Sequence, residues 1–229
     1  MSIEDAPRIQ LLAGPTPVEE MSRLRAVLGG RGVPRLLVKR DDAISFGFGG
    51  NKVRKLEFAL AEAMARGADT IVTLGGVQSN HARATAAAAA KMGLKCVLII
   101  NGSPPERPTA NALLDRLLGA EIEYISSRDA RAEASERVMT RLARSGRTPF
   151  LIPLGASTSV GALGFVNAVG ELVEQGLKPD VIVHACSSGG TQAGLVAGAA
   201  LHGLDARIIG VSADDPAPDV VATVRRIVR

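Results

Sequence analysis

Two lysines follow a glycine-rich loop in the segment ISFGFGGNKVRKLE, residues 44–57. Lys52 and Lys55 lie where this loop gives way to a predicted helix. Only six of the 27 basic residues are lysines, which singles out this pair. Three kinds of chemistry fit the pattern: a loop that binds nucleotide phosphates, a lysine that bonds a carbonyl cofactor, and a glycine hinge beside ordinary surface charges.

The nucleotide interpretation fails on spacing. A Walker loop needs GxxxxGK[ST], and the residues around Lys52 break both the Gly–Lys step and the hydroxyl position. Neither glycine-rich stretch gives the GxGxxG of a dinucleotide site. A lysine near a helix N-terminus is opposed by the helix dipole, which favours a neutral, nucleophilic amine or a nearby anion. Lys52 is therefore a candidate covalent lysine, with a plain surface lysine as the alternative.

Two strand-to-helix turns carry further polar residues. In HACSSGGTQAGL the predicted strand ends at Cys186 and a helix begins near Thr191, so backbone N–H groups and hydroxyls can hold one phosphate. In GGVQSNH the polar residues at a helix start exceed the one that capping requires; they are Gln78, Ser79, Asn80 and His81. Each turn is equally compatible with a purely structural role, in which its polar residues only cap the following helix. A covalent lysine with a separate one-phosphate turn is what pyridoxal phosphate requires.

The composition limits the class of protein. The 229 residues are 46% hydrophobic and 22% charged with a mean hydropathy of +0.18, typical of a globular chain with a large core. The net charge of +4 comes from arginines mixed with acids, and aromatics are 3%, which argues against nucleic-acid binding. Cys96 and Cys186 lie in apolar runs without metal-ligand spacing, so we expect no metal, reduced thiols and a cytoplasmic location. No apolar run reaches membrane-spanning length.

Predicted strands alternate with predicted helices from Lys52 onward. The strands are too apolar to belong to a sheet with one solvent-exposed face. This pattern predicts an α/β protein with parallel sheets flanked by helices. Nearer the N-terminus, Thr16, Pro17 and Glu19 form a capping-box pattern, so we expect a helix there that ends at Gly29–Gly30.

Two glycine- and serine-rich crossings divide the predicted elements. One is GFGG and the other is LGASTSVGALG, residues 154–164. They bracket an αβ block of the size of a small domain. We therefore expect an inserted smaller lobe of residues 53–157 and a larger cofactor-binding lobe of residues 1–52 plus 158–229, with the ligand between them.

Six segments together resemble one family. PTPVEEM, VKRDD, FGGNKVRKLE, GGVQSNHAR, GASTSVGALGFV and SSGGTQAGL resemble, in this order, the D-cysteine desulfhydrase and 1-aminocyclopropane-1-carboxylate (ACC) deaminase family. These are pyridoxal-phosphate enzymes of the tryptophan-synthase-β fold type (fold type II), and the resemblance covers nearly the whole chain. It implies pyridoxal 5'-phosphate as cofactor, a small amino-acid substrate and a homodimer.

The resemblance also implies roles for single residues. Lys52 resembles the lysine that bonds the cofactor, and Lys52 and Ser79 resemble the catalytic pair for proton transfer. Asn80 resembles the partner of the cofactor's ring oxygen, and substrate contacts are implied for Gln78, Ser79, Asn80 and His81. The implied phosphate-binding residues are Lys55, Ser187, Ser188, Gly189, Gly190 and Thr191. His81 stands where ACC deaminases are expected to have Gln, which favours the D-cysteine branch.

The implied reaction converts D-cysteine to pyruvate, sulfide and ammonia after loss of the Cα proton, with ACC or cysteate as the alternative substrates. Members of this family are longer, and their C-terminal part carries the partner of the pyridine nitrogen and a substrate-side tyrosine. Tyr124, the single tyrosine, cannot supply that group by motif. The alternative to an active enzyme is a truncated, non-catalytic remnant. We also expect exposed sheet and helix faces.

Overall fold

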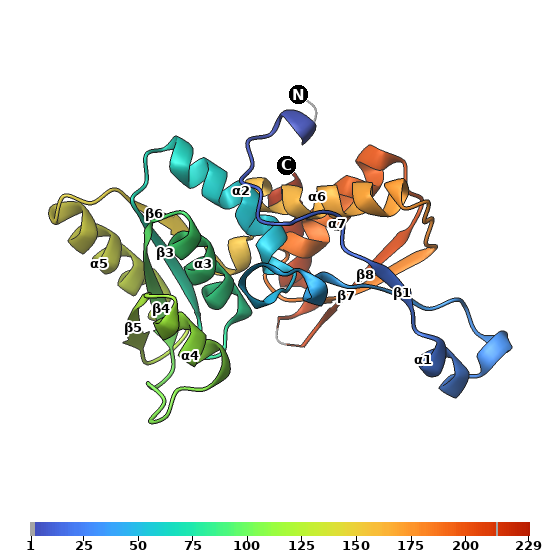
Figure 1. Ribbon diagram of the computed structural model, residues 1–229, viewed down its shortest axis with the longest axis horizontal. Helices are drawn as coiled ribbons and strands as arrows, with labels where there is room; N and C mark the ends of the chain where they lie inside the picture. Colours follow the sequence, from blue (N-terminus) through green and yellow to red (C-terminus); the bar gives the residue numbers. More distant parts are fainter. Residues whose placement is uncertain (1–2, 214) are drawn as a thin grey trace.

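Helices and strands alternate along most of the chain in the computed structural model, which describes residues 3–213 and 215–229 (Figure 1). The strands are β1 (Val18–Glu20), β2 (Leu37–Lys39), β3 (Thr70–Gly76), β4 (Lys95–Asn101), β5 (Glu121–Ile125), β6 (Pro149–Ile152), β7 (Val181–Cys186) and β8 (Arg207–Ser212). The α-helices are α1 (Ser22–Val27), α2 (Lys52–Ala65), α3 (Asn80–Lys91), α4 (Ala110–Leu117), α5 (Arg131–Arg144), α6 (Ser159–Glu174), α7 (Gly190–His202) and α8 (Ala217–Val228). The predicted α/β class is confirmed.

A four-stranded parallel sheet, in the order β5-β4-β3-β6, forms the centre of one group of elements. Alternate residues along its strands point to opposite faces. Ile71 and Leu98 pack with apolar residues of α2 and α3, whereas Val72 and Ile99 pack with Val138 of α5. Both faces are therefore covered, as Figure 1 shows, and this explains why β3 and β4 are continuous apolar runs in the sequence.

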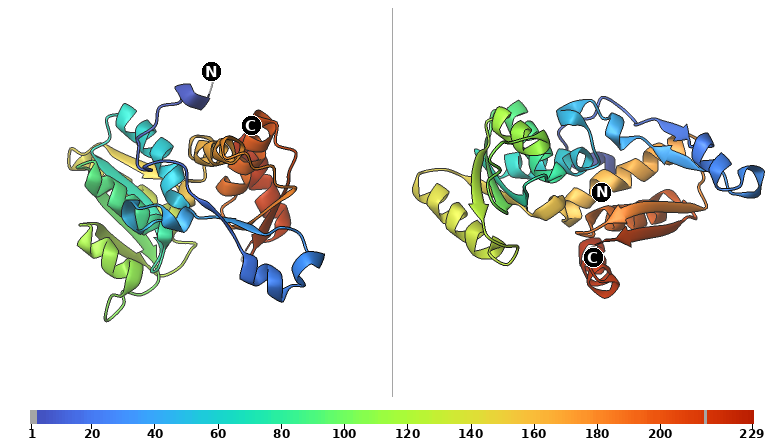
Figure 2. Two further views of the ribbon diagram at one scale, coloured as in Figure 1. Left: turned by 45° about the vertical axis from the view of Figure 1, so that its right-hand side comes forward. Right: turned by 90° about the horizontal axis from the view of Figure 1, so that it is seen from below.

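A second group of elements is built on two short sheets (Figure 2). β7 and β8 pair in parallel, and β1 pairs with β2 in an antiparallel ribbon. Apolar residues of α6 and α7 pack against one face of β7 and β8. On the opposite face, Val181, Val183 and Val211 are 46%, 63% and 58% exposed. An exposed apolar sheet face was expected from the sequence, and this is where it lies.

The helix start predicted from the capping pattern at Thr16 is wrong, although a helix, α1, does end just before Gly29–Gly30. Val18–Glu20 forms β1, whose backbone pairs with β2, and α1 begins only at Ser22. The Thr16 hydroxyl does not cap a helix, because it donates to the carboxylate of Asp41 at 3.0 Å. Partners from distant parts of the chain thus outweigh the local capping pattern.

The predicted lobe boundaries stay a prediction. α2 begins at Lys52 and α6 at Ser159, so the chain enters and leaves the elements of the four-stranded sheet close to the predicted positions. α2 and α6 pack against each other, and this helix pair joins the two groups of elements (Figure 1). Cys96 and Cys186 are free and buried, as expected. In the described part of the chain, no helix is long and apolar enough to cross a membrane.

Gly194 of α7 faces the backbone of α6 at very short range. A Cβ on Gly194 would lie 2.3 Å from the carbonyl oxygen of Ala162 and 2.5 Å from Cβ of Phe165. Gly194→Ala therefore forces the two helices apart, and we expect the free energy of unfolding to fall by about 2–3 kcal/mol in a urea titration. Gly14→Ala is the control, because a Cβ there meets nothing within 4 Å, and it should change little. Equal effects of the two substitutions would contradict the close approach.

Candidate active site

The glycine loop before α2 has a fixed conformation that sets the position of Lys52. Residues 47–50 all have positive φ. Only glycine fits at Gly49, because a Cβ there would lie 2.4 Å from the carbonyl oxygen of Asp42. Arg83 of α3 donates through Nη1 to backbone oxygens of this loop, including that of Gly49 at 3.1 Å. The loop is therefore held from both sides, and α2 starts at a defined place.

Lys52 is the first residue of α2 and is half-buried. Its Nζ donates to Oδ1 of Asn51 at 3.0 Å. Burial lowers the pKa of Lys52 from its ordinary value. The helix dipole acts in the same direction, because it disfavours a cation at a helix N-terminus. A neutral amine, which a nucleophile or a base requires, is therefore easier to form here than on a surface lysine.

Lys55 lies three positions further along α2 and is 1% exposed. Its Nζ donates to the carbonyl oxygen of Gly155 at 3.2 Å and lies 5.9 Å from the centre of the Phe165 ring. Burial, together with the charge of Lys52, lowers the pKa of Lys55 to about 7, and Cys186 opposes the shift. No carboxylate of the described residues contributes to this pKa. A bound anion would supply the missing partner of the buried cation.

Glycines let polar side chains lie very close to the Lys55 amine. A Cβ on Gly190, the first residue of α7, would lie 2.8 Å from Nζ of Lys55 and 2.7 Å from Oγ of Ser157. A Cβ on Gly155 would lie 2.6 Å from Oγ of Ser188. The two serine hydroxyls are 2.7 Å apart. An amine, two hydroxyls and the N–H groups of a helix start thus lie together; this group of donors suits a bound anion, and we name it the anion cradle.

The predicted turn of residues 187–191 contributes unequally to the anion cradle. Ser188 belongs to it, but Ser187 is exposed and its hydroxyl is directed at Oδ2 of Asp215, 3.5 Å away. Gly189 has φ +75°, so its place in the turn depends on glycine's freedom in the left-handed region. Thr191 is half-buried in the first turn of α7. Ligand contacts of Ser187, Gly189 and Thr191 stay predictions.

The predicted QSNH segment forms the turn between β3 and α3. Ser79 caps α3, because its Oγ accepts from the backbone N–H of Ala82 at 3.1 Å, and its own proton stays free to donate. Asn80 is exposed, and its Oδ1 accepts from Nδ2 of Asn111 at 2.9 Å. The Gln78 side chain accepts from the backbone N–H of Asn111 at 3.0 Å. Gln78 is thus used to fix the turn, and its contact with substrate stays a prediction.

His81 is buried behind this turn, with 3% exposed. Its Nε2 lies 2.9 Å from Oγ1 of Thr73, whose proton goes to the carbonyl oxygen of Ile152 at 2.7 Å. Nε2 of His81 is therefore the donor and Nδ1 carries the lone pair. Burial, together with the charges of Lys52 and Lys55, lowers the pKa of His81 to about 3. His81 is therefore neutral at ordinary pH, and its helix α3 packs against α2, which carries both lysines.

Two residues of this arrangement were not predicted as site residues, Ser157 and Asn111. Ser157 lies in a segment that the sequence marked only as a glycine- and serine-rich crossing. Asn111 lies at the start of α4, in a segment without any motif. The serines of this crossing are the one sequence signal that could have indicated Ser157. Nothing in the sequence indicates Asn111.

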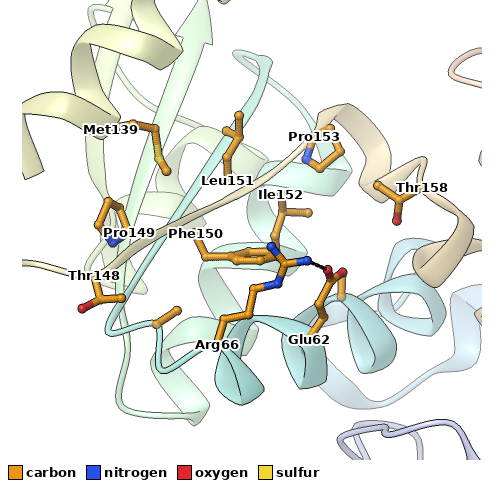
Figure 3. A pocket seen from close by; sticks show the side chains of 12 residues that line it. Glu62, Arg66, Met139, Thr148, Pro149, Phe150, Leu151, Ile152, Pro153 and Thr158 are labelled. Carbon is orange, nitrogen blue, oxygen red and sulfur yellow. Dashed lines mark hydrogen bonds and ion pairs between the residues drawn. The ribbon is translucent and has the colours of Figure 1, made fainter. Parts of the chain in front are cut away.

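A separate hollow of about 450 Å³ lies between α2 and β6 (Figure 3). Arg66 lies along it, paired with Glu62 at 2.5 Å and with its guanidinium 5.5 Å from the centre of the Phe150 ring. None of its lining residues belongs to the lysine pair or the anion cradle. Within residues 3–213 and 215–229, no group of three or more His, Cys, Asp or Glu could hold a metal.

The residues at the start of α2 fit pyridoxal phosphate on two counts. The anion cradle has the positive charge and the hydrogen-bond donors that a single phosphate group requires. Lys52, on the same helix, offers an amine of lowered pKa for an aldehyde. Together with parallel sheets covered by helices, these features define the class of pyridoxal-phosphate-binding α/β proteins.

Similarity to known proteins agrees with this class and defines the family. Residues 9–228 match the family described as "Pyridoxal-phosphate dependent enzyme", and the chain belongs to this family. The D-cysteine desulfhydrase of Klebsiella pneumoniae is 39% identical over 228 residues, which are 94% of this chain and 68% of that protein. The 1-aminocyclopropane-1-carboxylate deaminase of Burkholderia ambifaria is 40% identical over 242 residues, 100% of this chain and 71% of that protein.

The same relationship is seen in three dimensions. The crystal structure of an ACC deaminase homologue matches with a TM-score of 0.92 and 35% sequence identity, over 99% of this chain and 69% of its own. The resemblance found in the sequence is thereby confirmed at the level of the family. The chain spans about two thirds of the length of the curated relatives it matches.

Lys55 gives the stability a pH dependence whose sign follows from its lowered pKa. A lysine has a pKa of about 10.4 in an unfolded chain, whereas burial sets that of Lys55 to about 7 in the fold. Between these values the unfolded chain binds a proton that the folded chain lacks, so the free energy of unfolding rises with pH. The rise is at most about 1.4 kcal/mol per pH unit, and urea titrations across this window measure it.

Two substitutions isolate the contribution of Lys55 to this slope. Lys55→Met should abolish most of the rise, because methionine does not titrate. Lys95→Met, at an exposed lysine, should keep it. The same slope in the wild type and in Lys55→Met would show that Lys55 keeps its proton in the folded chain.

Proposed function

We propose that this chain is a pyridoxal-phosphate-dependent lyase or deaminase of small amino acids, with D-cysteine as its substrate. The observation that carries the proposal is the pair of lysines on α2: a half-buried Lys52 with a lowered pKa, and a sealed Lys55 in the anion cradle. A phosphate held at Lys55 would bring the aldehyde of the same small molecule into the neighbourhood of Lys52.

The residues at the start of α2 and α3 have the properties that the chemistry needs. When bound, pyridoxal phosphate supplies an electron sink beside the Cα of an amino acid. Nζ of Lys52, with its lowered pKa, is suited to take the Cα proton. Oγ of Ser79 is held by the N–H of Ala82 and retains a proton to donate. Asn80, exposed at the turn, is suited to bind the ring oxygen of the cofactor.

The choice of D-cysteine rests on His81, because the relatives do not separate the two substrates. The D-cysteine desulfhydrase of Klebsiella pneumoniae is as similar to this chain as the ACC deaminase of Burkholderia ambifaria. The sequence pattern at His81 favours the former. D-Cysteine and water would give pyruvate, hydrogen sulfide and ammonia. ACC would give a four-carbon 2-oxo acid and ammonia, and cysteate would release sulfite in place of sulfide.

The test loads the purified chain with pyridoxal phosphate and follows its visible spectrum and its products. We expect a visible band and, with D-cysteine, equal amounts of pyruvate and sulfide above those formed by free pyridoxal phosphate. A four-carbon 2-oxo acid from ACC without sulfide from D-cysteine would favour the alternative substrate. A band without any product would favour a cofactor-binding remnant, and the absence of a band would contradict the proposal.

We also propose that the chain acts in the cytoplasm as a homodimer. The buried free thiols Cys96 and Cys186 are compatible with a reducing compartment. The exposed valines of β7 and β8 indicate a surface that gains from being covered. Analytical ultracentrifugation of the loaded chain gives the number of subunits, and a monomer at micromolar concentration would contradict the dimer.

A further inference from the structure

Three carboxamides form a chain of hydrogen bonds where the β3–α3 turn meets the start of α4. Nδ2 of Asn111 donates to the backbone oxygen of Gln78 and to Oδ1 of Asn80, both at 2.9 Å. The Gln78 side chain accepts from the backbone N–H of Asn111 at 3.0 Å and donates to the backbone oxygen of Thr109 at 3.2 Å. α3 and α4 pack against each other, as Figure 1 shows, and this chain of bonds joins their first residues.

The orientation of each carboxamide follows from backbone atoms whose roles are fixed. A backbone oxygen only accepts and a backbone N–H only donates. The Gln78 atom that faces the N–H of Asn111 is therefore its oxygen, and the Asn111 atom that faces the backbone oxygen of Gln78 is its nitrogen. The Asn80 atom that faces this nitrogen must then be its oxygen. Asn80 is left with its Nδ2 group, which is a donor.

The Nδ2 group of Asn80 is a donor at the exposed start of α3. Asn80 is exposed, and its Nδ2 donates to no acceptor within the described parts of the protein. His81, the next residue, is close enough to Lys52 and Lys55 to feel both charges. The start of α3, a helix that packs against α2, therefore offers one unused amide N–H to a ligand.

The start of α4 has an unusual backbone conformation and an unusual cap, and it places Asn111 next to Asn80. Ala110, the first residue of α4, has φ +46°, a region that is unfavourable for residues with a Cβ. Thr109 makes no side-chain capping bond, and Gln78 from the β3–α3 turn accepts the free helix N–H in its place. The strained backbone is thus held by the bonds that orient Asn80.

We propose that Asn111 is a positioning residue, which holds the carboxamide of Asn80 so that it presents an N–H, and not an oxygen, to the ring oxygen of bound pyridoxal phosphate. The inference rests on the proposed function, in which Asn80 is the partner of that oxygen. A reversed carboxamide would place a lone pair against a negatively charged oxygen. A donor instead stabilises the deprotonated oxygen and lowers its pKa.

The test follows the visible absorption band of the loaded protein as a function of pH. Asn111→Asp keeps the shape of the side chain but cannot donate, so Asn80 has to turn its nitrogen toward position 111. We expect the pKa at which the absorption band changes to be higher than in the wild type by about one pH unit or more. The free energy of one hydrogen bond to a charged oxygen corresponds to a shift of this size. Gln10→Glu, an exposed amide-to-acid change, is the control and should leave this pKa unchanged.

A double-mutant cycle separates the orientation of Asn80 from the added charge. In an Asn80→Ala background, Asn111→Asp brings the same negative charge but no carboxamide is left to reverse. The rise in pKa should therefore be clearly smaller in that background than in the wild type. Asn111→Ser, which is neutral and cannot hold Asn80, should raise the pKa in the same direction in the wild type.

The outcomes distinguish this inference from the proposed function. An unchanged pKa in Asn111→Asp, or an equal rise in both backgrounds, would overturn the positioning role while the wild-type band stays normal. A wild type that forms no visible band with pyridoxal phosphate would overturn the proposed function and the inference together. Lower thermal stability of the variants with an unmoved pKa would leave Asn111 with a structural role alone, and would also overturn the inference.

Discussion

Replacing Arg54 by methionine lowers the free energy of unfolding by about 3–5 kcal/mol. Arg54 of α2 is 2% exposed and joins three segments that are distant in sequence. Its Nε and Nη2 donate to the two carboxylate oxygens of Asp41 at 2.9 and 2.8 Å. Its Nη1 donates to Oε1 of Glu171 on α6 at 2.7 Å, and its Nη2 donates to Oγ1 of Thr16 at 2.8 Å. The variant loses all of these bonds at once.

The loss is large because methionine leaves two carboxylates without the cation they share. Asp41 and Glu171 become like charges in a partly buried site, although Lys39 still pairs with Glu171 at 2.8 Å. Burial acts to raise the pKa of Glu171, but Arg54 and Lys39 hold it below its ordinary value. This stabilisation is present above the ordinary carboxylate pKa of about 4.3 and is lost as the pH falls through the lower folded value. The difference between wild type and variant is therefore largest at neutral pH.

Arg66→Met on the same helix is the matched control. Arg66 pairs with Glu62 at 2.5 Å, but its side chain is 67% exposed. Exposed pairs of this kind contribute about 1 kcal/mol or less, so this variant should remain close to the wild type. Urea titrations of both variants at neutral pH measure the difference. Similar losses in Arg54→Met and Arg66→Met would contradict the buried network.

The Arg54 network also illustrates which parts of the fold the sequence could predict. The alternation of apolar strands and helices predicted the parallel sheet, because burial on both faces leaves a visible pattern in β3 and β4. The partners of Arg54 could not be predicted, since Thr16, Asp41 and Glu171 are brought together only by tertiary packing. The capping pattern at Thr16 was wrong for the same reason.

The candidate site likewise has residues that the sequence could predict and residues that it could not. Lys52 and Lys55 could be singled out because a rare residue type follows a glycine loop, and Ser188 and Gly190 because they form a strand-to-helix turn. Each of these signals is local in the sequence. Asn111 gave no signal, because its role depends on which way three carboxamides face, and that is set by backbone atoms of two separate turns.

Lys52→Met abolishes the covalent attachment of pyridoxal phosphate to this chain, which is the largest effect we expect. Lys55 is the rival nucleophile. Burial lowers its pKa to about 7, so it is more often neutral near neutral pH than an ordinary lysine. The pKa alone would therefore favour Lys55, and geometry has to decide between the two amines.

The surroundings of the two amines favour Lys52 as the covalent residue. Nζ of Lys55 is bonded to the carbonyl oxygen of Gly155, is 1% exposed, and lies where a Cβ on Gly190 would collide with it. This enclosure hinders the attack of the Lys55 amine on an aldehyde, whereas the nearby serine hydroxyls and the start of α7 favour a role for Lys55 in binding an anion. Lys52 is half-buried, and its Nζ has an exchangeable side-chain partner in Asn51.

Borohydride reduction followed by peptide mapping distinguishes the two lysines. We expect the wild type to carry the reduced label on Lys52 and Lys52→Met to carry none. Lys55→Met should still be labelled on Lys52, but with an affinity for pyridoxal phosphate that is lower by about 10- to 100-fold, because one hydrogen bond to a charged phosphate is lost. Label on Lys55 in the wild type would reverse the assignment of the two residues. It would also mean that the anion cradle opens in solution, since the amine is sealed in the fold described here.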